Sequence, residues 1–173
     1  IVPDANGGMA DVVLGYDDPN AYLTDRFYLG ALIGRFSNRI AGGAFMLEGA
    51  PVRVTQNQGT THLHGGHRGF NRVRWEMAPF SAPGVRGVVL TYTSADGEEG
   101  FPGTLATRVT YSLTDDGVWD VAYHAESDRP TVVNLTQHSY FNLGGAGSAL
   151  DHEIRIAAAR FLPQTEGQLP TGE

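Results

Sequence analysis

The sequence predicts an all-β protein built as a sandwich of antiparallel sheets. Short runs of β-branched and aromatic residues recur along the chain, and turn sequences rich in Gly and Asp separate them. Glycine accounts for 23 of the 173 residues, roughly twice its usual ~7% share, which indicates many tight turns. Helical periodicity is hard to find and no repeat or composition break appears, so we expect one β-sandwich domain over residues 1–173.

The clearest strands lie in the middle of the chain. Residues 85–94, 104–113 and 118–125 are rich in β-branched and aromatic residues, which favour strands. Residues 114–117 (TDDG) predict a hairpin loop between the last two, because Asp and Gly supply the backbone geometry of a tight turn.

A second hairpin is predicted earlier in the sequence. Residues 48–51 (EGAP) form its loop, between strands at 44–47 and 52–56. Three further strands are expected at residues 11–16, 131–143 and 152–157.

Composition excludes several classes of function. The net charge of -7 and the pI near 5.3 argue against a surface for nucleic acid or anionic membrane, and no apolar run approaches the ~18 residues of a spanning helix. The chain has no Cys and all 12 basic residues are Arg, so thiolate and Schiff-base chemistry are excluded within it. We expect a cytoplasmic protein that binds neither nucleic acid nor membrane.

Residues 34–40 (GRFSNRI) form the first cluster with chemical potential. Two arginines lie among apolar residues there, and each needs a partner because an unpaired buried charge is costly. One interpretation is a structural arginine paired with a carboxylate; the other is a donor fork for a hydroxyl-rich or anionic ligand. Asn38 and Arg39 would point to opposite faces of a strand, so both can serve one pocket only at a bulge or strand end, which Gly42 and Gly43 make plausible.

The second cluster places three histidines within six residues: His62, His64 and His67. If the segment is extended, His62 and His64 share a face, which suggests a metal site. Zinc usually needs a third ligand and carboxylates that orient the rings, yet no acidic residue lies between Glu48 and Glu76. Structural histidines around a Gly-rich turn, or an imidazole that faces a ligand, are the alternatives.

The third cluster is the segment 133–145, which carries a polar stripe. On an extended strand His138, Tyr140 and Asn142 share one face. Histidine titrates near neutral pH and is therefore suited to proton transfer, although a single histidine on a strand is more often structural.

Taken in order, five segments resemble the aldose 1-epimerase (galactose mutarotase) family. They are VVLGY at 12–16, GRFSNRI at 34–40, HLHGGHRGF at 62–70 with Trp75, NLTQHSYFNLG at 134–144, and LPTGE at 169–173. This resemblance implies a galactose mutarotase-like antiparallel supersandwich. It also implies interconversion of the α and β anomers of free hexoses such as galactose or glucose, with no metal and no cofactor.

The resemblance also implies roles for individual residues. His138 resembles the general acid that protonates the ring oxygen, and His64 resembles a substrate-binding imidazole. Asn38 and Arg39 resemble the pair that hydrogen-bonds sugar hydroxyls, and Tyr140 is a neighbouring pocket residue. Arg35 is expected to be structural.

In the family, the general base is a glutamate that follows the segment matching 169–173. The resemblance also places strands before the segment matching residues 1–4. We therefore expect the chain to be the N-terminal and middle part of a longer domain that is cut at both ends. We expect it to be inactive by itself, with Glu173 in a loop rather than acting as the base. Two alternatives stay open: a non-catalytic carbohydrate-binding domain, and a hexose-6-phosphate 1-epimerase. The latter would need further arginines, such as Arg68, Arg72 or Arg74, near the pocket.

Overall fold

The computed structural model describes residues 1–4 and 6–172, so Glu173 lies outside the described residues. The chain divides into two compact units. One comprises residues 1–31 and 137–173, and the other comprises residues 32–136.

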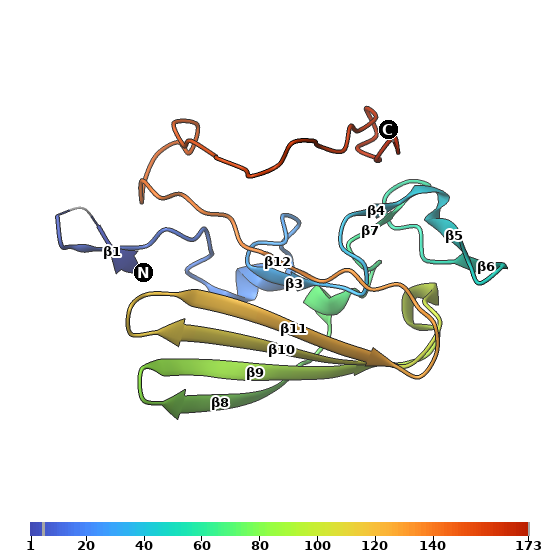
Figure 1. Ribbon diagram of the computed structural model, residues 1–173, viewed down its shortest axis with the longest axis horizontal. Coiled ribbons are helices and arrows are strands. Elements are labelled where there is room, and N and C mark those ends of the chain that lie inside the picture. Colours follow the sequence, from blue (N-terminus) through green and yellow to red (C-terminus); the bar gives the residue numbers. More distant parts are fainter. Residues whose placement is uncertain (5, 173) are drawn as a thin grey trace. The chain divides into compact units, whose positions relative to one another are not determined.

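A four-stranded antiparallel sheet dominates the second unit (Figure 1). In order across the sheet its strands are β11 (Trp119–Ser127), β10 (Leu105–Thr114), β9 (Val85–Ser94) and β8 (Glu76–Ala82). Three of these confirm the central strands predicted from the sequence, with ends that differ by two residues at most. Along β10, Leu105, Thr107 and Val109 are buried while Ala106 and Arg108 are exposed, which is the alternation of a strand with one face in a core.

Both predicted hairpins are present. Between β10 and β11 the Gly117 N–H donates to the Thr114 carbonyl at 3.0 Å, and the Thr114 N–H donates to Val118 at 3.0 Å. The earlier hairpin joins β5 (Ala44–Leu47) to β6 (Ala50–Arg53). Its loop is only Glu48 and Gly49, with φ of 48° and 81°. Two residues of positive φ match the twist of a hairpin, so residues 50 and 51 belong to the strand and not to the loop as predicted.

Strand β8 is the one strand of this four-stranded sheet that was not predicted from the sequence. It contains Pro79, and all of its residues except Phe80 are exposed. It pairs only with β9 and is an edge strand of the sheet, the position where proline is tolerated. Because apolar and polar residues do not alternate along it, the sequence of β8 does not predict a strand.

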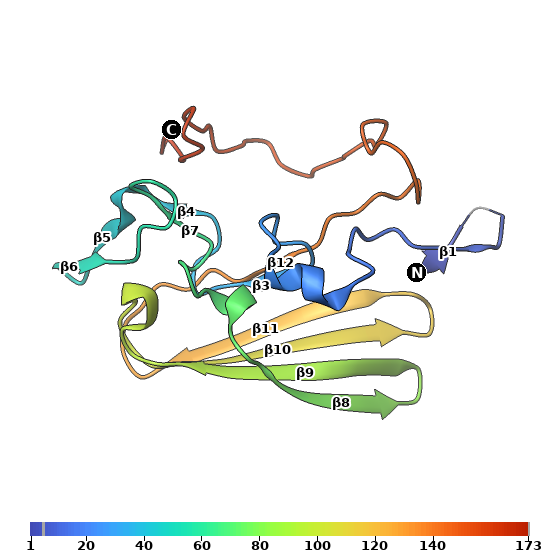
Figure 2. The same cartoon turned by 180° about the vertical axis from the view of Figure 1, so that it is seen from behind.

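The core of the second unit lies against one end of the sheet. Ile33, Phe101, Leu105 and Val109 are almost completely buried there. Figure 2 shows the turn η3 (Phe70–Arg72) leading into β8, and η4 (Glu98–Gly100) at the end of the sheet where β9 passes to β10. The sheet therefore gives these loops a fixed base.

Three shorter elements lie before β5 and after β6. They are β3 (Ala31–Ile33), β4 (Arg39–Ile40) and β7 (His62–Leu63). Strand β4 pairs with β7, and the turn η2 (Ala41–Gly43) follows β4 directly.

The first unit has little regular structure in its described residues. It contains the pair β1 (Val2–Pro3) and β2 (Met9–Ala10), the turn η1 (Pro19–Leu23) and the end of β12 (Thr136–His138). The strand predicted at 11–16 is reduced to a single bridge between Val13 and Phe141, and the one predicted at 131–143 to β12 and isolated bridges.

The prediction of a strand at residues 152–157 is wrong. The backbone there is coil, and Ile154 is 82% exposed. A strand needs a partner for its backbone N–H and C=O groups, and no described residue pairs with this segment. In the described part of the chain, no helix is long or apolar enough to cross a membrane.

Candidate functional site

In the second unit, three of the residues singled out from the sequence meet where β4 and β7 pair. Arg39 lies opposite Leu63 in this antiparallel pair. Asn38 precedes β4 with φ of 66°, and His64 follows β7 with φ of 51°. The two residues face each other: the Asn38 N–H donates to His64 Nδ1 at 3.0 Å, and the His64 N–H donates to the Asn38 carbonyl at 3.0 Å.

Asn38 and Arg39 satisfy the geometric condition stated for them. The left-handed backbone of Asn38 ends the extended conformation at the start of β4, so the two side chains are not forced to opposite faces. Arg39 Nη1 donates to Asn38 Oδ1 at 3.2 Å, which places both side chains on one side.

Gln58 completes this group, and sequence reasoning missed it. Its Oε1 accepts from Arg39 Nε at 2.8 Å. The guanidinium of Arg39 is therefore held at Nε and Nη1, and Nη2 makes no hydrogen bond to any described residue. The only signal was the polar stretch of residues 56–61 just before β7, which does not by itself indicate an arginine partner.

The tautomer of His64 follows from its partner. Because Nδ1 accepts the Asn38 N–H, the hydrogen of the neutral ring is assigned to Nε2. In this tautomer Nε2 is the donor nitrogen of the ring.

The two glycines after His64 allow this turn to form. At Gly65, with φ of +91°, a Cβ atom would lie 1.7 Å from the carbonyl oxygen of Gly34. At Gly66, with φ of +97°, it would lie 2.1 Å from the Glu99 carboxylate. Only glycine permits both the backbone conformation and the close approach. The Leu-His-Gly-Gly sequence is therefore explained locally by backbone packing.

Arg35 is structural. It is 2% exposed and donates to Ser94 Oγ at 2.8 Å, to the Ser94 and Ala95 carbonyls at 3.0 and 2.6 Å, and to the Pro102 carbonyl at 3.1 Å. Its direct partners are thus carbonyl and hydroxyl oxygens and not the carboxylate that one interpretation assumed. The carboxylate with the largest effect on Arg35, Glu98, accepts a hydrogen bond from the Ser94 hydroxyl. Burial lowers the pKa of Arg35, and Glu98 opposes that effect.

His62 is not joined to His64 by an extended backbone, because β7 ends at Leu63 and His64 has a φ of 51°, so the condition for a shared face is not met. The His62 ring is fully buried against Phe101, at 5.1 Å between centroids, and Nδ1 lies 2.7 Å from the Thr55 carbonyl. Its Nε2 has no hydrogen-bond partner among the described residues. Burial lowers the pKa of His62 despite the Thr55 contact. Within residues 1–4 and 6–172, no three His, Asp or Glu side chains are grouped so that they could hold a metal ion.

In the first unit, His138 and Tyr140 lie together. Their ring centroids are 5.1 Å apart, and Tyr28 stacks obliquely on His138 at 5.8 Å. The Tyr140 hydroxyl donates to the Phe27 carbonyl at 3.0 Å. His138 is half-buried and Tyr140 is exposed, so this aromatic group is accessible at one side.

Asn142, the third residue of the polar stripe, has a different role. It is buried, and its Nδ2 donates to the Gly147 carbonyl at 3.1 Å while Oδ1 accepts from the Gly144 N–H at 3.1 Å. Both groups of its amide are used inside a loop. It stabilises that loop and does not extend the surface formed by His138 and Tyr140.

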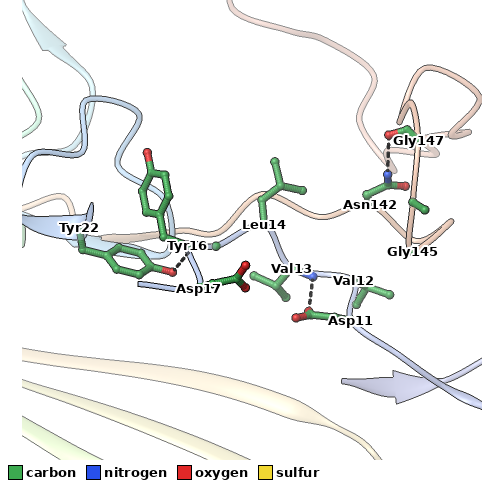
Figure 3. Close-up of a pocket in the computed structure, with 12 residues that line it drawn as sticks. Asp11, Val12, Val13, Leu14, Tyr16, Asp17, Tyr22, Asn142, Gly145 and Gly147 are labelled. Carbon is green, nitrogen blue, oxygen red and sulfur yellow. Dashed lines mark hydrogen bonds between the residues drawn. The ribbon is translucent and has the colours of Figure 1, made fainter. Parts of the chain in front are cut away.

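The first unit also contains an open cavity of about 630 Å³ (Figure 3). It is lined by residues 11–17, Tyr22, Asn142 and residues 145–147. Tyr22 closes one side, where its hydroxyl accepts from the Tyr16 N–H at 3.0 Å. None of the five site residues predicted from the sequence lines it.

The predicted site residues thus form two local groups. Asn38, Arg39 and His64 are joined by hydrogen bonds in the second unit, and His138 and Tyr140 pack together in the first. Within each group the chemistry is that of a polar ligand site: a fixed cation and an imidazole donor in one, and an imidazole beside two phenol rings in the other.

Comparison with known proteins identifies the family. A family model described as aldose 1-epimerase matches residues 1–173. Galactose mutarotase from Bos taurus is 47% identical over 174 residues, which cover 99% of this chain and 49% of that protein. Aldose 1-epimerase from Escherichia coli K12 is 39% identical over 170 residues, 98% of this chain and 48% of that protein.

A solved structure extends the similarity to three dimensions. The crystal structure of the GalM/aldose epimerase homologue from C. elegans matches with a TM-score of 0.90 and 32% identity, over 99% of this chain and 52% of that one. The expected fold class, a mostly β protein with antiparallel sheets of the mutarotase type, is confirmed by this match. The chain spans about half the length of the curated relatives it matches. It belongs to the aldose 1-epimerase family.

Proposed function

We propose that the protein carrying this sequence is an aldose 1-epimerase that interconverts the α and β anomers of free hexoses such as galactose or glucose. The observation that carries the proposal is the family match over residues 1–173, which includes every residue singled out for the site. The local geometry supports it, because both groups offer neutral or cationic donors suited to the hydroxyl and ring oxygens of a sugar.

The proposed reaction is a proton transfer in two directions. His138 donates a proton to the ring oxygen while a base removes the proton of the anomeric hydroxyl, so the bond between the anomeric carbon and the ring oxygen breaks and an aldehyde forms. Rotation of the aldehyde and closure from its other face give the second anomer. The family resemblance assigns the role of base to a glutamate that, in the family, follows the segment matching residues 169–173 of this chain.

Substrate binding is assigned to the second group. Arg39 would donate from Nη2, which has no partner among the described residues, and His64 would donate from Nε2. Asn38 holds both residues through its backbone and its side chain. Tyr140 is placed beside the acid, where its ring contacts His138.

Polarimetry tests the proposal directly. Fresh α-galactose or α-glucose should approach its equilibrium rotation faster with the protein, and His138→Asn should remove most of that acceleration, on the order of 10²- to 10⁴-fold for a general acid. His124→Asn is a matched control: His124 is an exposed histidine on β11 that contacts Glu126, and its loss should leave the rate unchanged.

Three outcomes would contradict the assignment. An unchanged rate in His138→Asn would remove His138 from the mechanism. Sugar binding with a flat pH profile and no rate effect would indicate a non-catalytic carbohydrate-binding domain. Faster equilibration of a hexose 6-phosphate than of the free hexose would indicate the phosphosugar enzyme. The group around Asn38 contains one arginine, Arg39, whose donors are matched to a neutral sugar as well as to a phosphate.

A further inference from the structure

The segment from Asp25 to Gly30 is organised by a single carboxylate. Asp25 accepts hydrogen bonds from the Tyr16 hydroxyl at 2.8 Å, from the Phe27 N–H at 3.2 Å and from the Leu29 N–H at 3.1 Å. Burial alone would raise the pKa of Asp25, but these hydrogen bonds lower it below its usual value. The carboxylate is therefore ionised at neutral pH, and it stabilises the turn by accepting hydrogen bonds from the Phe27 and Leu29 N–H groups.

Tyr28, in the middle of this turn, has a strained backbone. Its φ is 58°, a left-handed conformation that is uncommon for a bulky residue and costs on the order of 1 kcal/mol or more. The turn maintains it: Phe27 and Leu29 on either side are bound to Asp25, and the Tyr28 carbonyl accepts from the Ala31 N–H at 3.0 Å. Such strain persists where the surroundings over-determine it, often at functional positions.

The strained conformation directs the Tyr28 ring onto His138. The two ring centroids are 5.8 Å apart with an interplanar angle of 37°. The Tyr140 ring also lies near this imidazole, with its centroid 5.1 Å from that of His138. The imidazole therefore has a phenol ring as neighbour from each of two segments about a hundred residues apart in the sequence.

The same turn also forms hydrogen bonds with the backbone of His138 and with the side chain of Gln137. The Gly30 N–H donates to the His138 carbonyl at 3.1 Å, and Gln137 Nε2 donates to the Gly30 carbonyl at 2.8 Å. The Tyr140 hydroxyl reaches back to the Phe27 carbonyl at 3.0 Å. Backbone and ring of His138 are thus both tied to one short segment.

We propose that Tyr28, held by the Asp25 turn, is a positioning residue that orients the imidazole of His138 for proton transfer. This inference rests on the proposed function of His138 as the acid. Tyr28 does not itself need to touch the sugar. Proton transfer depends on alignment of the donor nitrogen with the acceptor oxygen, and small misplacements are expensive in rate, so a side wall that limits rotation of the imidazole contributes to kcat more than to binding.

A pair of substitutions separates the ring from the hydroxyl of Tyr28. Tyr28→Phe keeps the ring and should retain kcat within about twofold, whereas Tyr28→Leu removes the wall and should lower kcat roughly tenfold with little change in KM. Asp25→Asn weakens the turn and should give the same signature with a smaller loss. Tyr123→Leu is the control: it removes a partly exposed tyrosine ring from β11 and should leave kcat unchanged.

A spectroscopic readout decides the inference independently of activity. In NMR spectra of the protein, the imidazole proton signals of His138 should shift in Tyr28→Leu, because the neighbouring aromatic ring is lost, and stay in place in Tyr28→Phe and Tyr123→Leu. Unmoved His138 signals in both Tyr28→Leu and Asp25→Asn, or a Tyr28→Leu enzyme with the original kcat, would overturn the inference. If the unsubstituted protein does not accelerate mutarotation, the proposed function fails, while the His138 signals still report whether Tyr28 holds the ring.

Discussion

Arg35 offers the sharpest test of what stabilises the second unit, because its hydrogen bonds join residue 35 to the end of β9 and to the connection that follows β9. The perturbation is Arg35→Met, which keeps an unbranched side chain in a site that is almost completely buried and removes every donor. Four hydrogen bonds are lost, to one hydroxyl and three carbonyl oxygens. The acceptors belong to Ser94 at the end of β9 and to Ala95 and Pro102 in the connection from β9 to β10, and they stay in the protein without these donors.

The magnitude follows from burial and charge. A hydrogen bond from a charged donor contributes about 1.5–3 kcal/mol, but four bonds to one guanidinium are not additive, and removing a buried charge also relieves its desolvation. Each buried acceptor left without its donor costs about 1–3 kcal/mol. Glu98, which accepts a hydrogen bond from the Ser94 hydroxyl, also loses the neighbouring positive charge of Arg35. We therefore expect the free energy of unfolding to fall by about 3–5 kcal/mol.

Urea denaturation of the protein followed by circular dichroism measures this change, and Arg86→Met is the matched control. Arg86 is exposed and forms one ion pair with Asp115 at 3.4 Å, so the same substitution there should change the free energy of unfolding by less than about 1 kcal/mol. If the two variants unfold within 1 kcal/mol of each other, the buried hydrogen-bond network of Arg35 does not carry the stability assigned to it.

Two further predictions concern the second unit. Gln58→Met should raise KM for the sugar about fivefold, because Arg39 loses the acceptor at Nε. Gln56→Met, which loses a hydrogen bond to Gly42 instead, should leave KM unchanged, and equal KM values in steady-state mutarotation assays would refute the role of Gln58. For His62, burial lowers the pKa below its ordinary value of 6.5, so the unfolded state binds more protons and the free energy of unfolding falls as pH drops below about 6.5. His62→Phe should flatten that pH dependence in urea denaturation between pH 5 and 7, and an unaltered slope would show that His62 does not contribute to it.

The elements that were predicted correctly share one property. In β9, β10 and β11, residue types and turn residues point to the same structure, and the hairpin at Thr114–Gly117 needs no distant contact to form. Strand β8 was missed because its position at the sheet edge tolerates Pro79 and exposed side chains. Residues 152–157 were predicted as a strand from their apolar pattern, but this segment has no partner strand among the described residues.

The candidate site shows the same division. Residue chemistry and family resemblance indicated all five site residues. Local structure joins Asn38, Arg39 and His64 by hydrogen bonds. It packs His138 against Tyr140. The support of these residues was not predictable. Gln58 reaches Arg39 from 19 positions away, and Tyr28 reaches His138 from a turn whose conformation depends on a carboxylate.

The sequence by itself determined the class of the fold, the central antiparallel strands, the two hairpins and the identity of the residues suited to bind or protonate a sugar. These features depend on side-chain type and on interactions between close neighbours in the chain. Only the tertiary structure decided that Arg35 is a buried scaffold, that the His62 ring is buried against Phe101, and that Tyr28 lies against His138. Burial and hydrogen-bond partners are set by segments distant in the sequence, and a side chain's role follows from those partners rather than from its chemistry alone.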